Sequence, residues 1–122
     1  MEFKDKADVG SWGEQQAREY LVKKGYCILE TNWHDSHREI DIIASQGDEI
    51  VIVEVKTRTS TFLNPADAVN KQKQKLLIAA ANYYVRKNNI DKNVRFDIIS
   101  IVAVNGEIHI EHIENAFYPL LR

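Results

Sequence analysis

The chain of 122 residues has a single cysteine, Cys27, which excludes an internal disulfide and a cysteine-rich metal site. Such a chain suits a reducing compartment, and we expect the cytoplasm. No hydrophobic run approaches the roughly 20 residues that span a bilayer, and the first residues alternate charges, so neither a membrane segment nor a secretion signal is predicted. Internal repeats, low-complexity tracts and linkers are also absent, which favours one domain over residues 1–122.

An excess of positive charge is also missing, because the formal net charge is -2. This balance argues against a protein that coats DNA through bulk charge. The charges are nevertheless unevenly distributed: residues 56–95 carry a net +7, and the rest of the chain carries -9. The contrast suits a protein that binds a polyanion on one side and a cation among carboxylates on the other. On charge alone, an ordinary mixed surface explains the pattern equally well.

Hydrophobic periodicity and turn residues predict the order αβββαββ. The expected helices cover residues 9–24 and about 70–87, and the expected strands cover residues 26–31, 39–44, 50–56, 94–104 and 107–113. Asn70 is expected to cap the second helix, and Asn105-Gly106 is a strong hairpin signal. A right-handed crossover between residues 50 and 104 would make two strands parallel. We therefore expect an α/β fold with a mixed sheet flanked by helices.

Two charged residues interrupt a strand that otherwise looks buried. Residues 50–56 are nearly all β-branched, as in a central strand, yet Glu54 and Lys56 lie near its end. If the loop at residues 46–49 joins antiparallel strands and Ser45 pairs with Ile50, Asp41 faces Glu54. Asp41, Glu54 and Lys56 then share one sheet face. In the preceding strand the alternation places Ile40, Ile42 and Ala44 together on the opposite face.

Facing carboxylates repel each other, and a divalent cation between them converts the repulsion into coordination. Mg²⁺ prefers oxygen ligands and is normally held by one or two carboxylates with substrate phosphate, so Asp41 and Glu54 are the candidate ligands, with Mn²⁺ as a substitute. Lys56 would orient the attacking water or stabilise charge on the phosphoryl oxygens. The alternative is a structural ion network at one end of the sheet.

Further candidates lie around this centre. Glu14 lies on the rim of the buried stripe of the first helix and would complete the site through a metal-bound water. An ion pair with Arg18 explains it equally well. Lys73 heads the stripe of the second helix and would reach a phosphate, unless it is simply a solvated lysine. The basic segment supplies the candidate DNA contacts, which are Arg58, Lys71, Lys73 and Lys75. The histidines have no predicted role: His34 and His37 are expected in a loop, and His109 and His112 point to opposite faces.

Glu39-Ile40-Asp41 followed by Glu54-Val55-Lys56 resembles the PD-(D/E)XK nuclease motif. The resemblance is closer to the small bacterial YraN family, and its further matching stretches are Gly13-Glu14, Asn32-Trp33, Thr57-Arg58 and Arg95-Phe96-Asp97. That family is similar to archaeal Holliday-junction resolvases. The resemblance implies a restriction-endonuclease-like αβββαβ core, a Mg²⁺ site, structure-selective DNA cleavage, and catalytic roles for Glu14, Asp41, Glu54 and Lys56. It also matches Lys73 to a lysine of the second helix. Arg38 departs from the family, which usually has glycine there, and this departure affects the loop conformation.

The leading hypothesis is therefore a Mg²⁺-dependent endonuclease that hydrolyses DNA phosphodiester bonds, including those of branched DNA. The alternative is a nucleic-acid-binding protein of the same fold with weak or no catalysis that serves a DNA-processing assembly. A third hypothesis is an interaction module without metal or DNA affinity. We expect a homodimer, because one metal site cuts one strand and a twofold axis would present two sites to strands of matching symmetry.

Overall fold

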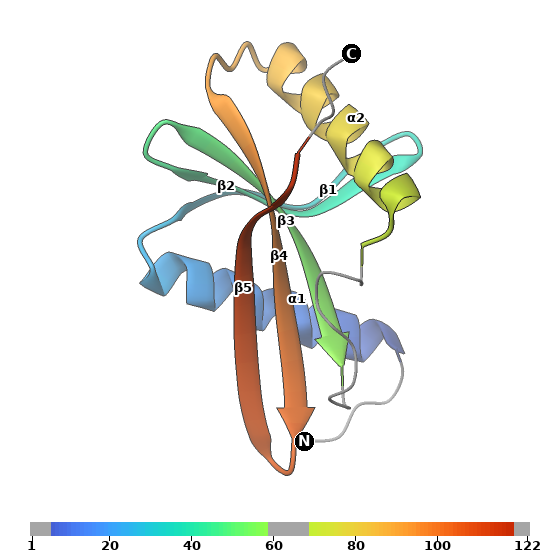
Figure 1. Cartoon of the computed structure of the whole chain (residues 1–122), viewed down its shortest axis with the longest axis vertical. Helices are drawn as coiled ribbons and strands as arrows, with labels where there is room; N and C mark the ends of the chain where they lie inside the picture. Colours follow the sequence, from blue (N-terminus) through green and yellow to red (C-terminus); the bar gives the residue numbers. More distant parts are fainter. Residues whose placement is uncertain (1–5, 59–68, 119–122) are drawn as a thin grey trace.

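The chain forms one five-stranded mixed sheet with a helix on each face (Figure 1). A computed structural model describes residues 6–58 and 69–118, with side chains described from residue 9 onward. The elements are α1 Lys6–Lys23, β1 Cys27–Asp35, β2 Arg38–Gln46, β3 Glu49–Arg58, α2 Lys71–Lys87, β4 Asn93–Val104 and β5 Glu107–Phe117. The predicted order αβββαββ is confirmed.

The strands lie side by side in sequence order, and their pairing confirms the predicted mixed sheet. The pairs β1–β2, β2–β3 and β4–β5 are antiparallel, and β3–β4 is parallel. A parallel pair needs a crossover connection, which here includes α2. The α/β class and the two flanking helices are consistent with a restriction-endonuclease-like core.

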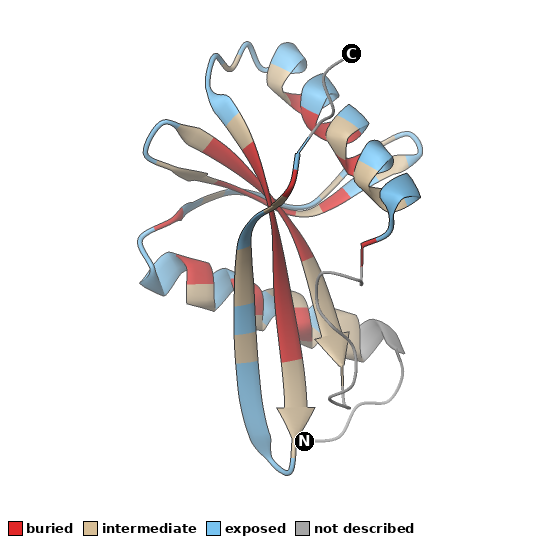
Figure 2. Ribbon diagram, in the orientation of Figure 1, coloured by how far each residue is buried: buried red, intermediate tan, exposed pale blue. Residues whose placement is uncertain are grey.

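The two helices bury different faces of the sheet. On the α1 face, Ala17 and Leu21 pack against β-branched residues of β2, β3 and β4. On the α2 face, Leu77, Ala80 and Tyr84 form the predicted stripe of the second helix. Buried residues therefore concentrate in the central strands β3 and β4, as Figure 2 shows. In the described part of the chain, no helix is long and apolar enough to cross a membrane.

The predicted helix cap and the predicted hairpin turn are confirmed. The Asn70 side chain caps α2 by accepting a hydrogen bond from the Lys73 N–H at 2.9 Å. Asn105 and Gly106 have φ angles of 52° and 79°, which is the left-handed pair that a two-residue hairpin requires. Gly25, with φ of 94°, follows the end of α1, where a left-handed residue commonly terminates a helix.

The prediction for β1 and for the faces of β2 was wrong in two respects. β1 continues to Asp35, so His34 lies in a strand and only Ser36 and His37 form the turn. The predicted common face of Ile40, Ile42 and Ala44 fails, because Ile40 packs on the α2 face while the other two pack on the α1 face. The change of face falls at Asp41, just beyond the end of the β2–β3 ladder, where the Asp41 side chain accepts a hydrogen bond from the Val55 N–H.

The departure at Arg38 does not disturb the loop. Ser36 is the left-handed residue of this turn, with φ of 50°, and Arg38 does not have a positive φ. Arg38 begins β2 and pairs with Asp35 of β1. A side chain is therefore compatible with the backbone at this position, because glycine is required only where φ is positive.

Gly13 fixes the distance between α1 and β3, and a Gly13→Ala substitution is expected to destabilise the fold. A Cβ on Gly13 would overlap Thr57 Oγ1 and lie 3.0 Å from Thr57 Cβ. Overpacking of this kind costs about 1–3 kcal/mol. The matched control is Gly10→Ala on the same helix, because nothing lies within 4 Å of a Cβ there. The control is expected to stabilise the helix by about 0.5–1 kcal/mol.

Urea unfolding of the two variants measures this difference. Adding Thr57→Ala to Gly13→Ala removes the overlapping hydroxyl and is expected to recover part of the loss. Equal stability of the Gly13→Ala and Gly10→Ala variants would show that α1 does not rest on Thr57.

Candidate active site

Asp41 and Glu54 meet where β2 and β3 separate. The β2–β3 ladder pairs Ser45 with Ile50, as predicted, and ends at Ile42 and Val53. Asp41 would occupy the next position opposite Glu54, but its Oδ2 accepts a hydrogen bond from the Val55 N–H at 2.9 Å. At this point β3 therefore bonds to the side chain of Asp41 instead of to the backbone of β2. This bond holds the Asp41 side chain next to the Glu54 side chain, and the two side chains are hydrogen bonded.

The pKa values of both carboxyl groups are raised. Burial, followed by the charge of Asp41, raises the pKa of Glu54 to about 7, and Lys73 and Lys56 oppose this rise. Burial also raises the pKa of Asp41, although the Val55 N–H and the Glu54 hydrogen bond lower it. Glu54 is only 5% exposed. A cation bound between the two carboxylates would relieve their mutual repulsion, because an opposite charge favours the ionised form of each acid.

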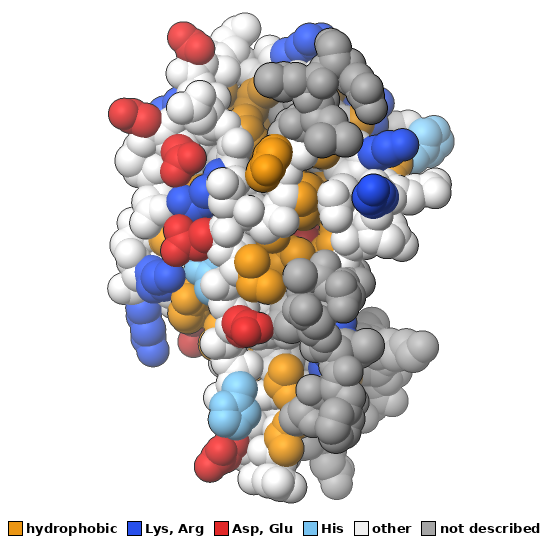
Figure 3. Space-filling view, viewed as in Figure 1, with side chains coloured by type: hydrophobic (Ala, Val, Ile, Leu, Met, Phe, Trp, Pro, Cys, Tyr) orange, Lys and Arg blue, Asp and Glu red, His pale blue; other side chains and the backbone are white. Residues whose placement is uncertain are grey.

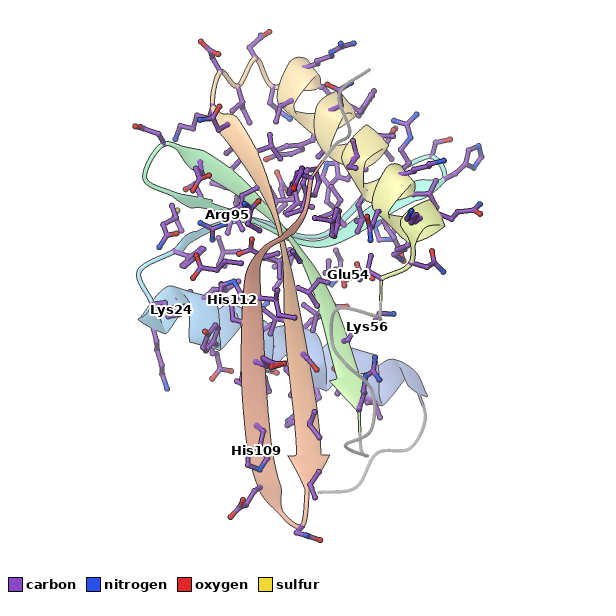
Figure 4. The ribbon with its side chains drawn as sticks, in the orientation of Figure 1. Lys24, Glu54, Lys56, Arg95, His109 and His112 are labelled. Atoms are coloured by element: carbon purple, nitrogen blue, oxygen red, sulfur yellow. The ribbon has the colours of Figure 1, made fainter. Side chains whose placement is uncertain are left out.

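Two lysines border the acid pair. Lys73 of α2 places its Nζ 3.4 Å from Glu54 Oε2. Lys56 lies two residues beyond Glu54 on β3, and its charge also acts on that carboxyl. In Figure 4, Glu54 and Lys56 project from the same stretch of β3. The structure therefore brings together the three residues predicted to share a sheet face and the lysine predicted to begin the buried stripe of α2, which are Asp41, Glu54, Lys56 and Lys73.

Glu14 of α1 also reaches this centre, through Asn32 of β1. Burial, followed by the charge of Asp41, raises the pKa of Glu14, whereas a hydrogen bond with the Asn32 side chain lowers it. The charge of Arg18 lowers the pKa of Glu14 less than the Asn32 hydrogen bond does, so the alternative of a simple ion pair with Arg18 does not account for the surroundings of Glu14. Asn32 was not a candidate in the sequence, and its left-handed backbone is the feature that places it.

The donor set fits a metal that takes few protein ligands. Among residues 6–58 and 69–118, no group of three or more His, Cys, Asp or Glu side chains is arranged to hold a metal by itself. Asp41 and Glu54 supply two carboxylates, and Mg²⁺ is usually bound by one or two carboxylates with waters and substrate phosphate. The chemistry of these donors therefore suits Mg²⁺ and does not suit a structural zinc site.

The four candidate DNA contacts do not form one surface. Lys73 lies beside Glu54, whereas Lys71 and Lys75 line a groove between α2 and the ends of β4 and β5. Two residues along a helix differ by about 200°, so Lys73 points away from both. Arg58 ends β3, and its Nη1 is buried without a hydrogen-bond partner among the described residues.

A second charged cluster lies on the α1 face. Arg95 donates two hydrogen bonds to Asp97, at 2.9 and 2.8 Å, and a third to the Tyr26 hydroxyl at 2.6 Å. His112 Nε2 lies 2.6 Å from Asp97 Oδ2, and its side chain is 2% exposed, so the interpretation of His112 as incidental was wrong. In Figure 4, Arg95 and His112 lie on the left of the view and Glu54 lies on the right.

This cluster was missed although its signal resembles that of the acid pair. Arg95 and Asp97 are two residues apart on a buried strand, so they share a face. Arg95 had been assigned to the basic segment, but it is buried and holds its charge inside the protein. The cluster is satisfied by its own hydrogen bonds, so it has the character of a structural network.

Relatives of the chain are found among bacterial proteins. The profile of the family described as "Uncharacterised protein family UPF0102" matches residues 13–101. A UPF0102 protein of Parabacteroides distasonis is 53% identical over 94% of this chain and 96% of its own length. One of Flavobacterium psychrophilum is 51% identical over 91% and 94%, and one of Phocaeicola vulgatus is 47% identical over 92% and 93%. The chain therefore belongs to the UPF0102 family.

Proposed function

We propose that this protein is a Mg²⁺-dependent nuclease that hydrolyses phosphodiester bonds in DNA. The observation that carries the proposal is the contact of Asp41 with the buried Glu54 next to two lysines, in which the pKa values of both carboxyl groups are raised. A buried acid pair is costly to maintain in the absence of a cation, and such perturbed groups concentrate at functional sites. Mg²⁺ held by this pair would polarise the scissile phosphate and lower the pKa of the attacking water.

The surrounding side chains have complementary roles in this proposal. Lys56 and Lys73 place two positive charges beside the carboxylates and stabilise the negative charge that develops on the phosphoryl oxygens. Glu14 has a raised pKa, which suits a group that orients a water or accepts its proton. Hydrolysis breaks the bond between phosphorus and the leaving oxygen, and that oxygen takes up a proton.

DNA contact and dimer formation complete the proposal. Lys73 of α2 contacts Glu54, and Arg58 is the last residue of β3, the strand that carries Glu54. Lys71 and Lys75, on the other side of α2, would contact a different part of the DNA. A dimer would present two acid pairs to a branched substrate.

The test is cleavage of linear, flapped and four-way DNA in the presence of Mg²⁺ or Mn²⁺. Lys56→Ala is expected to reduce cleavage by about 100-fold or more while leaving most DNA affinity, because it removes charge stabilisation at the reacting phosphate. The matched control is Lys92→Ala, an exposed lysine before β4, which is expected to cleave at the wild-type rate.

Cleavage that survives Lys56→Ala at the wild-type rate would place the activity elsewhere or show contamination. DNA binding by the wild-type protein without cleavage of any substrate would instead support the alternative, a nucleic-acid-binding protein of this fold. Absence of both metal and DNA affinity would leave only the interaction module.

A further inference from the structure

A hollow of about 240 Å³ lies between the turn that joins β1 to β2 and the first half of α2. Its polar lining consists of His34, Ser36, His37, Arg38, Glu39 and Lys73. Lys73 also lies 3.4 Å from Glu54, so the hollow opens beside the acid pair. Figure 1 shows the β1–β2 turn next to the start of α2, and Figure 3 shows basic side chains and a histidine gathered on that side.

The hollow presents positive charge. The Arg38 guanidinium lies 5.5 Å from the centre of the Tyr83 ring, and its Nη1 lies 3.5 Å from Asp35 Oδ2. These contacts hold the group in place, and because a guanidinium carries five N–H donors, several remain for an anion. Among the described residues of the lining, Glu39 is the acidic one, and its Oε2 lies 3.2 Å from His34 Nε2. Arg38 and Lys73 are the cations of the lining, and an incoming anion would share them with Asp35 and Glu54.

The size and the rim of the hollow indicate what it binds. Its volume is below the roughly 300–1,000 Å³ of sites that enclose small molecules, so it suits one unit of a longer ligand. The bases of a duplex are paired and stacked inside it, so an unpaired strand is the form of DNA that can present a phosphate to this hollow and a base to the side chains beside it. Leu76, which is 50% exposed, and Tyr83, which is 37% exposed, lie beside it and offer apolar surface to unstacked bases.

We propose that this hollow binds the backbone of an unpaired DNA strand next to the phosphodiester held at the acid pair, with Arg38 and Lys73 on its phosphates and His37 as a further donor. The inference rests on the proposed function and narrows its substrate class to DNA in which an unpaired strand adjoins a duplex. Asp35 and Tyr83 act as positioning residues for the Arg38 guanidinium.

The experiment is fluorescence anisotropy in EDTA with two labelled DNAs, a short duplex and the same duplex with a single-stranded tail. The wild-type protein is expected to prefer the tailed DNA. His37→Ala with Arg38→Ala is expected to lose about tenfold in affinity for the tailed DNA and little for the blunt duplex, because a charged hydrogen bond to phosphate is lost. The matched control removes the same residue types elsewhere, His109→Ala with Arg86→Ala, both of which are exposed.

A variant that keeps the wild-type preference, or a control that loses it equally, would overturn the inference. If the double variant melts at a lower temperature, His37→Glu serves instead, because it adds a negative charge at an exposed turn residue without touching the contacts of Arg38. That variant is expected to show the same selective loss. These measurements need neither metal nor cleavage. Failure of the wild-type protein to cleave DNA would therefore contradict the nuclease proposal, whereas the binding measurements alone decide the inference about the hollow.

Discussion

A metal-free Glu54→Gln variant is expected to unfold roughly 10 °C above the wild-type protein at pH 8. In the wild-type protein the pKa of Glu54 is raised from 4.5 to about 7, by burial first and by the charge of Asp41 second. Above pH 7 the fold must therefore hold the negative charge of the buried Glu54 beside that of the partly buried Asp41. The glutamine amide cannot ionise, and its N–H can still donate to Asp41 as the protonated acid does.

The direction of the pH dependence follows from the raised pKa of Glu54. The folded state binds this proton more tightly than the unfolded state, so the associated stability is complete below about pH 4.5 and is lost as the pH rises through 7. A shift from 4.5 to about 7 corresponds to a loss on the order of 3 kcal/mol. At pH 5 the variant and the wild-type protein are expected to differ little. Thermal unfolding followed by circular dichroism at both pH values measures the effect.

Magnesium provides the second half of this test. Because the ligands must be deprotonated, Mg²⁺ is expected to stabilise the wild-type protein more at pH 8 than at pH 6 and to leave Glu54→Gln nearly unchanged. Glu19→Gln is the matched control, since Glu19 is exposed on α1 and its loss should change neither the melting temperature nor the response to Mg²⁺. A Glu54→Gln variant that melts below the wild-type protein at pH 8 would contradict the acid pair as described.

The pairing of the central strands could be predicted because local patterns determine it. Residues 50–53 are all β-branched, and Asn105-Gly106 favours a tight hairpin, so the order of the elements along the chain and the pairing of Ser45 with Ile50 could be predicted. The full length of β1 could not be predicted, because residues 31–35 lie on an edge strand where polar side chains face solvent. Nothing in their composition distinguishes an edge strand from a loop.

The carboxylates of the candidate site were predictable, but the way they meet was not. The alternation of side chains along β2 and β3 predicted that Asp41 and Glu54 share a sheet face. That prediction assumes a regular ladder, but the β2–β3 ladder ends at Ile42 and Val53, one pair before Asp41 and Glu54. The bond from Val55 N–H to Asp41 and the left-handed backbone of Asn32 are departures from regular strand geometry. Departures of this kind depend on the tertiary packing around them, so periodicity in the sequence does not reveal them.

The spacing of Lys71, Lys73 and Lys75 along a predicted helix already implies that Lys73 lies on a different side of the helix from the other two. These lysines were grouped because they are close along the chain, but alternate residues of a helix point in nearly opposite directions. Only the packing of Leu77 and Tyr84 against the sheet shows which side of α2 faces the acid pair. Lys73 shares that side, and the other two lysines line a different groove.

Asp97→Ala is expected to lower the melting temperature by roughly 15 °C, the second large effect that the structure predicts. Asp97 is fully buried and accepts hydrogen bonds from Arg95 and from the Asn115 N–H at 3.0 Å. Removing one partner of a buried charge pair costs about 3–5 kcal/mol, because Arg95 loses its buried carboxylate and keeps, among the described residues, only the partly exposed Glu49 and Glu114 as ion-pair partners. Asp91→Ala makes the same substitution at an exposed site before β4 and is expected to have little effect on the melting temperature.

The pH dependence and a double variant identify the cause of this loss. Burial raises the pKa of Asp97, but the hydrogen bonds from His112 and Arg95 outweigh burial and lower it below 3.8, so its contribution is present above about pH 4 and is lost as the pH falls further. Arg95→Met with Asp97→Leu removes both charges and is expected to lose less stability than Asp97→Ala alone. Because Asp97 lies on the α1 face and Glu54 contacts Lys73 of α2, folded Asp97→Ala protein at low temperature should bind Mg²⁺ with wild-type affinity. Weakened Mg²⁺ binding by the folded variant would show instead that the network supports the acid pair.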